Sequence, residues 1–276
     1  MARASIPVDL LNPGQVFACM GFLELANVLF GHAEGGFDWA CRAEPRFGVC
    51  TRGDDNPFGV VLEFLCQAQL QCVASSGNPT GEDIGSRVET FPAPEADPLT
   101  LPVRLESRGR TLQVTHWCDG SSRNPFKLFA GQQSSTTIAT QMLDTVRRLW
   151  EEDHRGLMGD PLGATVPLGG STFKFDARKA WTTIDVGYSP NEQKNHVYAS
   201  PVVEILAAIG LEHARPDEFE TREVRYGVWK GLAPPALARP LLGGARLGIP
   251  LRVFRFTLAL AGKNKNVTFG QEETIS

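Results

Sequence analysis

The feature that most constrains the fold is one long apolar segment near the N-terminus. Asn12 and Pro13 form a typical helix start, as N-cap and first helical residue, and Gly31 is a typical helix end. The intervening residues are apolar on most sides of the predicted helix, so we expect a helix from about residue 15 to residue 30 that is largely buried. Other elements must therefore cover it, and its small residues allow one of them to pack closely: Ala18, Cys19 and Gly21.

Shorter patterns predict several more helices and strands. Capping residues and apolar stripes predict helices over residues 57–70, 135–152 and 202–209. Alternating apolar and polar residues predict strands, most clearly over 251–260, and also over 37–41, 47–51, 101–106, 111–117, 173–175, 182–186 and 224–228. Since helices and hairpins are mixed along the chain, the sequence predicts an α+β fold of mixed helices and antiparallel hairpins.

The chain divides into an N-terminal α+β region, residues 1–155, and a basic C-terminal α+β region, residues 171–276, which can pack as a single domain. A polar, proline-rich segment covers residues 74–102, and loops of that length are usually functional. The 28 glycines and 19 prolines are about 17% of the 276 residues, against a usual share of roughly 12%. So many turn formers argue against a long helical bundle or coiled coil.

The apolar run from Val16 to Phe30 is not expected to cross a membrane. Gly21, Glu24 and Asn27 interrupt it, and it is shorter than the roughly 20 residues that a span needs. The N-terminus lacks the pattern of a secretory signal. Six cysteines are too few for a disulfide scaffold and fit reduced thiols. We therefore expect a cytoplasmic protein without membrane contact.

Positive charge is concentrated near the C-terminus. Between Arg222 and Lys265 there are nine basic residues and one acidic residue, Glu223. Such a segment suits an anionic polymer, because guanidinium groups fork onto phosphates and neutralised phosphates release counterions. The binding residues predicted here are Arg225, Lys230, Arg239, Arg246, Arg252, Arg255, Lys263 and Lys265. A solvated surface spread over several faces is the alternative interpretation.

The most unusual loop covers residues 118–135. Its cations and backbone N–H groups would suit a phosphate, its glutamines could read base edges, and Phe126 or Phe129 could stack on a base. The alternative is an ordinary turn with both phenylalanines in the core. The binding residues predicted here are Arg123, Lys127, Gln132 and Gln133. We expect them to form one continuous surface with the basic C-terminal run.

The sequence contains no familiar catalytic or metal-binding motif. It lacks a nucleophile elbow, a zinc-protease helix motif, a phosphate-binding P-loop and a dinucleotide-binding glycine pattern. His116 and Cys118 are close together, but no cysteine pair completes a zinc site. We predict no catalytic residues, no metal and no cofactor. An enzyme of unrecognised type, with a pocket near Asp54, Asp55, His116 and Cys118, stays open as an alternative.

Several segments resemble one protein family. Residues 6–19, IPVDLLNPGQVFAC, and residues 21–26, GFLELA, are similar to the opening of a subunit family from type I-U CRISPR systems, also called I-G or the Dpsyc subtype. Residues 126–133, FKLFAGQQ, and residues 200–207, SPVVEILA, resemble later blocks of the same family. The resemblance therefore covers most of the chain.

The resemblance implies a non-catalytic subunit of a crRNA-guided surveillance complex (Cascade). Its class is large-subunit-like, which recognises the PAM and helps to open the target duplex. The implied partners are crRNA, target double-stranded DNA, the other Cascade subunits and a helicase-nuclease that is recruited after target binding. At 276 residues the chain is short for that role. The alternative is a backbone subunit of the RAMP type, with a ferredoxin-like core and inserted loops, that repeats along the crRNA.

In such a complex the protein reads phosphates, shape and a short PAM, while base pairing reads the sequence. Residues 1–100 carry 5 basic and 13 acidic groups, and would face protein neighbours or solvent. A structural adaptor without any nucleic-acid contact is a further alternative.

Overall fold

The structure is a computed structural model, and it describes residues 1–41, 43–72, 103–114, 126, 128–129, 135–168, 172–180, 197–261 and 263–273. Its helices and antiparallel strands form small sheets, so the predicted α+β fold is confirmed. The elements are β1 (Ala2–Pro7), α1 (Pro13–Phe30), β2 (Ala33–Asp38), β3 (Arg46–Thr51), α2 (Pro57–Gln67), β4 (Gln69–Cys72), β5 (Val103–Ser107), β6 (Arg110–Val114), α3 (Ser135–Gly159), β7 (Val166–Pro167), the 3-10 helix η1 (Ala177–Lys179), β8 (Tyr198–Ala199), α5 (Pro201–Gly210), β9 (Asp217–Glu220), β10 (Glu223–Trp229), α6 (Pro235–Leu242), β11 (Leu251–Ala261), β12 (Asn264–Val267) and β13 (Gln271–Glu273).

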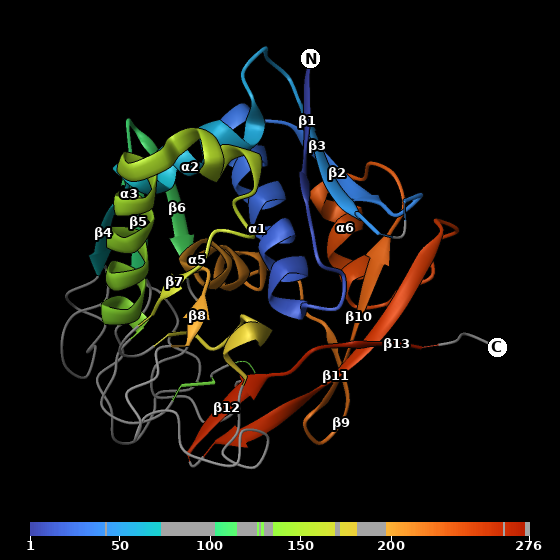
Figure 1. The fold of residues 1–276 in the computed structure, drawn as a ribbon. Coiled ribbons are helices and arrows are strands. Elements are labelled where there is room, and N and C mark those ends of the chain that lie inside the picture. The colour runs from blue at the N-terminus through green and yellow to red at the C-terminus, as the bar shows by residue number, and fades with distance from the viewer. Residues whose placement is uncertain are drawn as a thin grey trace, which may run out of the picture.

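Helix α1 lies at the centre of the molecule (Figure 1) and is buried from Pro13 to Ala26. The Asn12 side chain accepts a hydrogen bond from the Gly14 N–H at 3.1 Å, and Gly31 ends the helix in the left-handed conformation. Both ends of this helix are as the sequence predicts. One hydrophobic core runs from Ile6 to Val267, so both predicted regions of the chain contribute to it.

Helix α1 is also long and apolar enough to cross a membrane, the single such helix in the described part of the chain. However, 78% of it is buried inside the protein, as expected for the core helix of a soluble protein.

Glycines bring α1 and α5 into very close contact. A Cβ atom on Gly21 would lie 2.0 Å from the carbonyl oxygen of Leu206, and one on Gly210 would lie 2.3 Å from the carbonyl oxygen of Phe17. Neither position therefore has room for a side chain. The two backbones touch directly, and α2, α3, α6 and strands β2, β3 and β6 pack against one or the other helix.

The first sheet has the strand order β1-β3-β2. Both outer strands are antiparallel to β3, so β1 and β2 run parallel to each other and α1 connects them. With α2 and β4 following, the chain order is βαββαβ, which is the ferredoxin-like order. Strand β4, however, pairs with β5 in another sheet, so only three of the four ferredoxin-like strands share one sheet.

The second sheet is built on β11, which pairs with β10 along one edge and with β12 and β13 along the other. Strand β9 extends it beyond β10. Backbone hydrogen bonds between Gly35 and Ala233, both 2.9 Å, connect this sheet to β2. A third sheet, β4-β5-β6, packs beside α3, and its Arg108-Gly109 turn has positive φ at both residues, as a tight hairpin requires.

Some predicted elements were wrong or incomplete. Residues 173–175 are not a strand, β2 begins at Ala33 and not at Phe37, and the helix predicted over 57–70 ends at Gln67 and is followed by β4. Helix α6 and seven strands were not predicted: β1, β4, β7, β8, β9, β12 and β13. Residues 74–102 and 182–186 lie outside the described residues.

The close helix contact leads to a first prediction. Gly21→Ala should lower the free energy of unfolding by about 2–3 kcal/mol, because the new methyl group would overlap the Leu206 carbonyl unless the helices separate. Urea unfolding followed by circular dichroism measures this change.

Gly159→Ala is the matched control, since nothing lies within 4 Å of its Cβ position at the end of α3. It should change stability by no more than about 1 kcal/mol. Equal stability of both variants would contradict the close packing of α1 on α5.

Candidate nucleic-acid interface

The structure describes eight of the twelve predicted binding residues. Arg123, Lys127, Gln132 and Gln133 lie outside the described residues. Phe126 and Phe129 are described and are buried, with ring centroids 6.3 Å from Phe17 and 6.1 Å from Phe173 respectively. The expectation that either one stacks on a base is therefore wrong, and the core alternative holds.

Three of the predicted arginines already bind carboxylates. Each pairs with one glutamate in two hydrogen bonds of 2.6–3.0 Å: Arg225 with Glu273, Arg239 with Glu24, and Arg252 with Glu272. These hydrogen bonds raise the pKa of Arg239 and of Arg252. Each of these arginines therefore links two elements through its glutamate, and a phosphate would have to compete with that carboxylate for the guanidinium.

The other five predicted cations are Lys230, Arg246, Arg255, Lys263 and Lys265. Their side chains form no hydrogen bond or ion pair with other described residues. Strand alternation places Arg252 and Arg255 on opposite faces of β11, while Arg225 pairs with Arg255 in register and lies on the same face as Arg255. The expected continuous surface is therefore not formed by the described part of the basic run.

Lys230 lies at a groove on the solvent face of the first sheet, which we call the basic groove. The groove has a volume of about 480 Å³. Every second residue of β3 is buried, and in β1 Arg3 and Ser5 are more exposed than their neighbours, so the residues between the inward-facing ones face outward. The lining includes Arg3 and Ser5 of β1, Arg46 and Gly48 of β3, Gly36 and Asp38 of β2, and residues 230–232.

The backbone holds Lys230 firmly at this groove. Its N–H donates to the Pro250 carbonyl at 2.9 Å, and the following Gly231 N–H donates to the Phe37 carbonyl at 3.3 Å. The Trp229 indole N–H donates to the Gly35 carbonyl at 2.9 Å. Residues 229–233 are therefore fixed along the edge of β2, and the lysine side chain leaves from a rigid strand end.

The basic groove carries a net positive charge. Arg3 and Lys230 make no ion pair among the described residues, while Arg46 donates to the Ser5 hydroxyl at 3.0 Å and to the Ser5 carbonyl at 2.9 Å. The acid in the lining is Asp38. With three cations and no exposed aromatic ring, this groove suits sugar-phosphate backbone more than stacked bases.

A second groove, of about 600 Å³, lies on the outer face of the C-terminal sheet. It combines the exposed Arg255 with Phe269, which is 48% exposed. Beside it, the Arg225 guanidinium lies 3.6 Å above the Phe219 ring. Two carboxylates, Glu220 and Glu223, also line this groove, so it is less favourable to a polyanion than the basic groove.

Sequence reasoning missed Arg3 and Arg46. The signal was present: polar and apolar residues alternate through Ala2–Pro7 and Arg46–Thr51, and the first of these was not recognised as a strand. Once both strands are paired in register, Ser5 faces Gly48 and Pro7 faces Arg46, and the outward cations lie on one sheet face.

A buried polar junction is the main competing candidate for a site. Asp176 accepts hydrogen bonds from the Asn12 amide at 2.9 Å, from the Ser200 N–H at 2.8 Å and from the Arg178 guanidinium at 2.6 Å. Glu204 accepts from the N–H groups of Asp176 at 2.9 Å and Lys174 at 2.8 Å.

Perturbed carboxyl groups often mark active sites, but this junction is sealed. Asp176 is 1% exposed and Glu204 is 0% exposed. Burial raises the pKa of Glu204 to about 7 and lowers the pKa of the neighbouring Lys179 to about 8. The junction joins the N-terminal ends of α1, η1 and α5, and its hydrogen bonds hold these three ends together.

The residues of the alternative enzyme pocket are not brought together among the described residues. Asp54 and Asp55 are exposed, and Asp54 lies 3.9 Å from the N-terminal ammonium group. His116 and Cys118 lie outside the described residues. Within the described ranges, no group of three histidine, cysteine or acidic residues could hold a metal ion.

No family model, curated protein or solved structure matches the chain.

The raised pKa of Glu204 gives a second prediction. Between about pH 4.5 and 7 the folded protein keeps a proton on this group that the unfolded chain releases. The free energy of unfolding should therefore fall as pH rises through this range, by up to about 3 kcal/mol. Urea unfolding at several pH values measures this slope.

Glu204→Gln should remove most of that slope, since glutamine does not titrate. It should also destabilise the fold by about 1–3 kcal/mol at pH 5, because one of the two backbone N–H groups loses its acceptor. Glu151→Gln, at an exposed position of α3, is the control. If Glu204→Gln keeps the full slope, another group is responsible.

Proposed function

We propose that the chain is a non-catalytic, nucleic-acid-binding subunit of a type I-U/I-G CRISPR surveillance complex, acting in the cytoplasm. The observation that carries this proposal is the basic groove, with two unpaired cations and one anchored arginine on a rigid sheet face. Its chemistry suits the backbone of crRNA or of target DNA. The sequence resemblance supports the same class of protein.

The large-subunit-like role, with PAM recognition and duplex opening, is the function that the resemblance favours. One structural observation favours the backbone alternative: the βαββαβ chain order and the β1-β3-β2 sheet are the larger part of a ferredoxin-like core. Both roles require contact with nucleic acid and no catalytic residues, and both place the chain beside other Cascade subunits. The helicase-nuclease would be recruited separately after target binding.

A third prediction tests the basic groove. Arg3→Gln with Lys230→Gln should weaken binding of a short fluorescein-labelled RNA and lower the slope of log affinity against log salt by about 1 to 2 units, because two phosphate contacts are lost. Fluorescence anisotropy over a range of salt concentrations measures both quantities.

The matched control removes the same charge elsewhere. Arg155 and Arg215 are exposed and form no ion pair with described residues, so Arg155→Gln with Arg215→Gln should keep nearly the original slope. If both double variants change the slope equally, the binding is non-specific attraction to net charge and the groove is not the site.

A fourth prediction concerns assembly. Co-expression with crRNA and the other subunits of a type I-U/I-G complex should place the chain in a stable particle that contains RNA. Size-exclusion chromatography with absorbance at two wavelengths detects this particle. A chain that elutes as a monomer without RNA in that co-expression would contradict the proposed function.

A further inference from the structure

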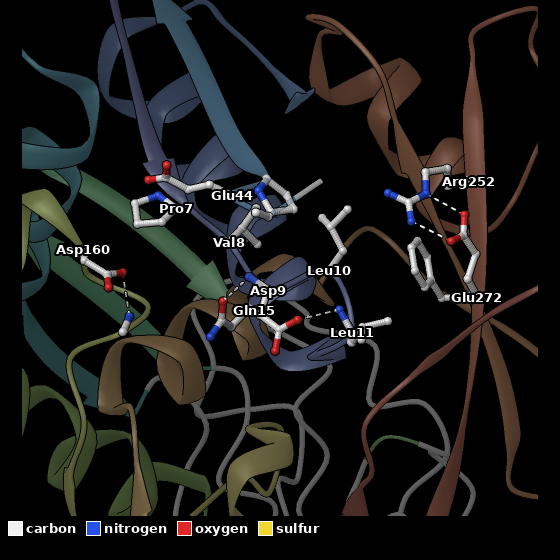
Figure 2. Close-up of a pocket in the computed structure, with 14 residues that line it drawn as sticks. Pro7, Val8, Asp9, Leu10, Leu11, Gln15, Glu44, Asp160, Arg252 and Glu272 are labelled. Atoms are coloured by element: carbon white, nitrogen blue, oxygen red, sulfur yellow. Dashed lines mark hydrogen bonds and ion pairs between the residues drawn. The ribbon is translucent and has the colours of Figure 1, made fainter. Parts of the chain in front are cut away.

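A second, chemically opposite groove lies between the end of β1 and the C-terminal sheet (Figure 2), and we call it the acidic groove. Its volume is about 610 Å³. Four carboxylates and one guanidinium line it, and these come from separate parts of the chain: Asp9, Glu44, Asp160, Glu272 and Arg252. The groove is therefore negative, where the basic groove is positive.

The charge of the acidic groove is only partly neutralised. Glu272 is paired with Arg252 at 2.6 Å, and Glu44 lies 3.3 Å from Arg46. Asp9 and Asp160 accept backbone N–H groups at 2.9 and 2.8 Å and form no ion pair with described residues. Two carboxylates at this groove therefore lack a cation.

Gln15 adds a hydrogen-bond donor to this groove. Its side chain lines the groove although the residue is only 7% exposed. Its amide oxygen accepts the Asp9 N–H at 2.7 Å, but no described residue accepts a hydrogen bond from its amide nitrogen. Figure 2 shows this nitrogen on the side of the amide away from Asp9. The accessible Gln15 amide nitrogen can therefore donate a hydrogen bond to a ligand in this groove.

The groove also offers apolar contact. Val8, Leu10 and Phe254 form buried parts of its lining, while Leu11 is 46% exposed. The Leu11 carbonyl accepts the Gly270 N–H at 2.6 Å, which places it next to Phe269, also about half exposed. The groove therefore offers apolar contact and carboxylates to the same ligand.

We infer that the acidic groove binds an extended segment of a partner protein that carries lysine or arginine side chains. The cations of the segment would pair with Asp9 and Asp160, a main-chain carbonyl would accept from Gln15, and an apolar side chain would cover Leu11. This inference rests on the proposed function, because a neighbouring subunit of the complex would supply the segment.

Other ligand classes fit this groove less well. Nucleic acid is repelled by the unpaired carboxylates. A polyamine satisfies the carboxylates but offers no acceptor to the Gln15 amide. A peptide carries cations, carbonyl acceptors and apolar groups on one chain, so it alone matches all three features.

The test is a titration of the full isotope-labelled chain with the peptide acetyl-Leu-Arg-Leu-Arg-amide, followed by amide chemical shifts. Acetyl-Leu-Gln-Leu-Gln-amide is the matched probe, and it should bind at least about fivefold more weakly, since its charged partners are absent. The largest shifts should fall on the backbone amides of residues 8–15 and 160–163. Equal binding of the two peptides would overturn the inference.

The second part of the test uses variants of residues that line the acidic groove. Asp9→Asn with Asp160→Asn keeps both backbone acceptors and should weaken the arginine peptide about fivefold, and Gln15→Met should weaken it several-fold. Glu151→Gln with Glu152→Gln, both exposed on α3, is the control and should leave binding unchanged. If the groove variants bind the arginine peptide as tightly as the wild type, the inference is overturned. It is also overturned if spermidine competes with the peptide and Gln15→Met does not change the affinity for spermidine.

RNA binding measured on the same variants separates the two proposals. Asp9→Asn with Asp160→Asn should leave the salt slope for RNA unchanged. Loss of peptide binding together with normal RNA binding supports the acidic groove and leaves the proposed function intact. A wild-type chain that binds RNA but not the arginine peptide overturns this inference alone, and one that binds the peptide but not RNA overturns the proposed function.

Discussion

The fold depends on the direct contact between the backbones of α1 and α5. Gly21 and Gly210 leave no side chain between the helices, so the carbonyl groups of Leu206 and Phe17 occupy the space that Cβ atoms would need. The start of each helix is then fixed by the same carboxylate, because Asp176 binds both Asn12 and the Ser200 N–H. A pair of helices held at the crossing and at their N-terminal ends has one relative orientation. The sheets and α6 take their positions from that pair.

Both grooves follow from this arrangement. The inner face of the β1-β3-β2 sheet packs on α1 through residues such as Ile6 and Phe47, so the charged residues of the same strands must face solvent. The second sheet approaches through Tyr226, whose hydroxyl donates to the Leu10 carbonyl at 2.7 Å. That contact closes one side of the acidic groove, while the contact of residues 230–233 with β2 closes one side of the basic groove.

The sequence could predict the elements whose signals are local. Asn12-Pro13, Asn56-Pro57 and Ser200-Pro201 each cap a helix through a side-chain hydrogen bond to the backbone, and each of these helices was predicted. Strand β2 contains adjacent glycines and α6 contains Pro240, so their patterns are weak and only tertiary contacts make them regular. The pairing of charged residues in the candidate site could not be predicted from the sequence. Glu24 lies 215 residues from Arg239, and no pattern of charge along the chain reveals that they pair.

The two grooves meet at the start of β3, and this links the two proposals. Arg46 lines the basic groove and Glu44 lines the acidic groove, and the two side chains lie 3.3 Å apart. A partner segment that neutralises the acidic groove would compete for Glu44 and leave the Arg46 guanidinium freer to bind phosphate. Binding of a basic protein segment on one side of β3 would therefore favour binding of nucleic acid on the other. Such coupling is what a subunit needs if it is to hold RNA or DNA only within its assembled complex.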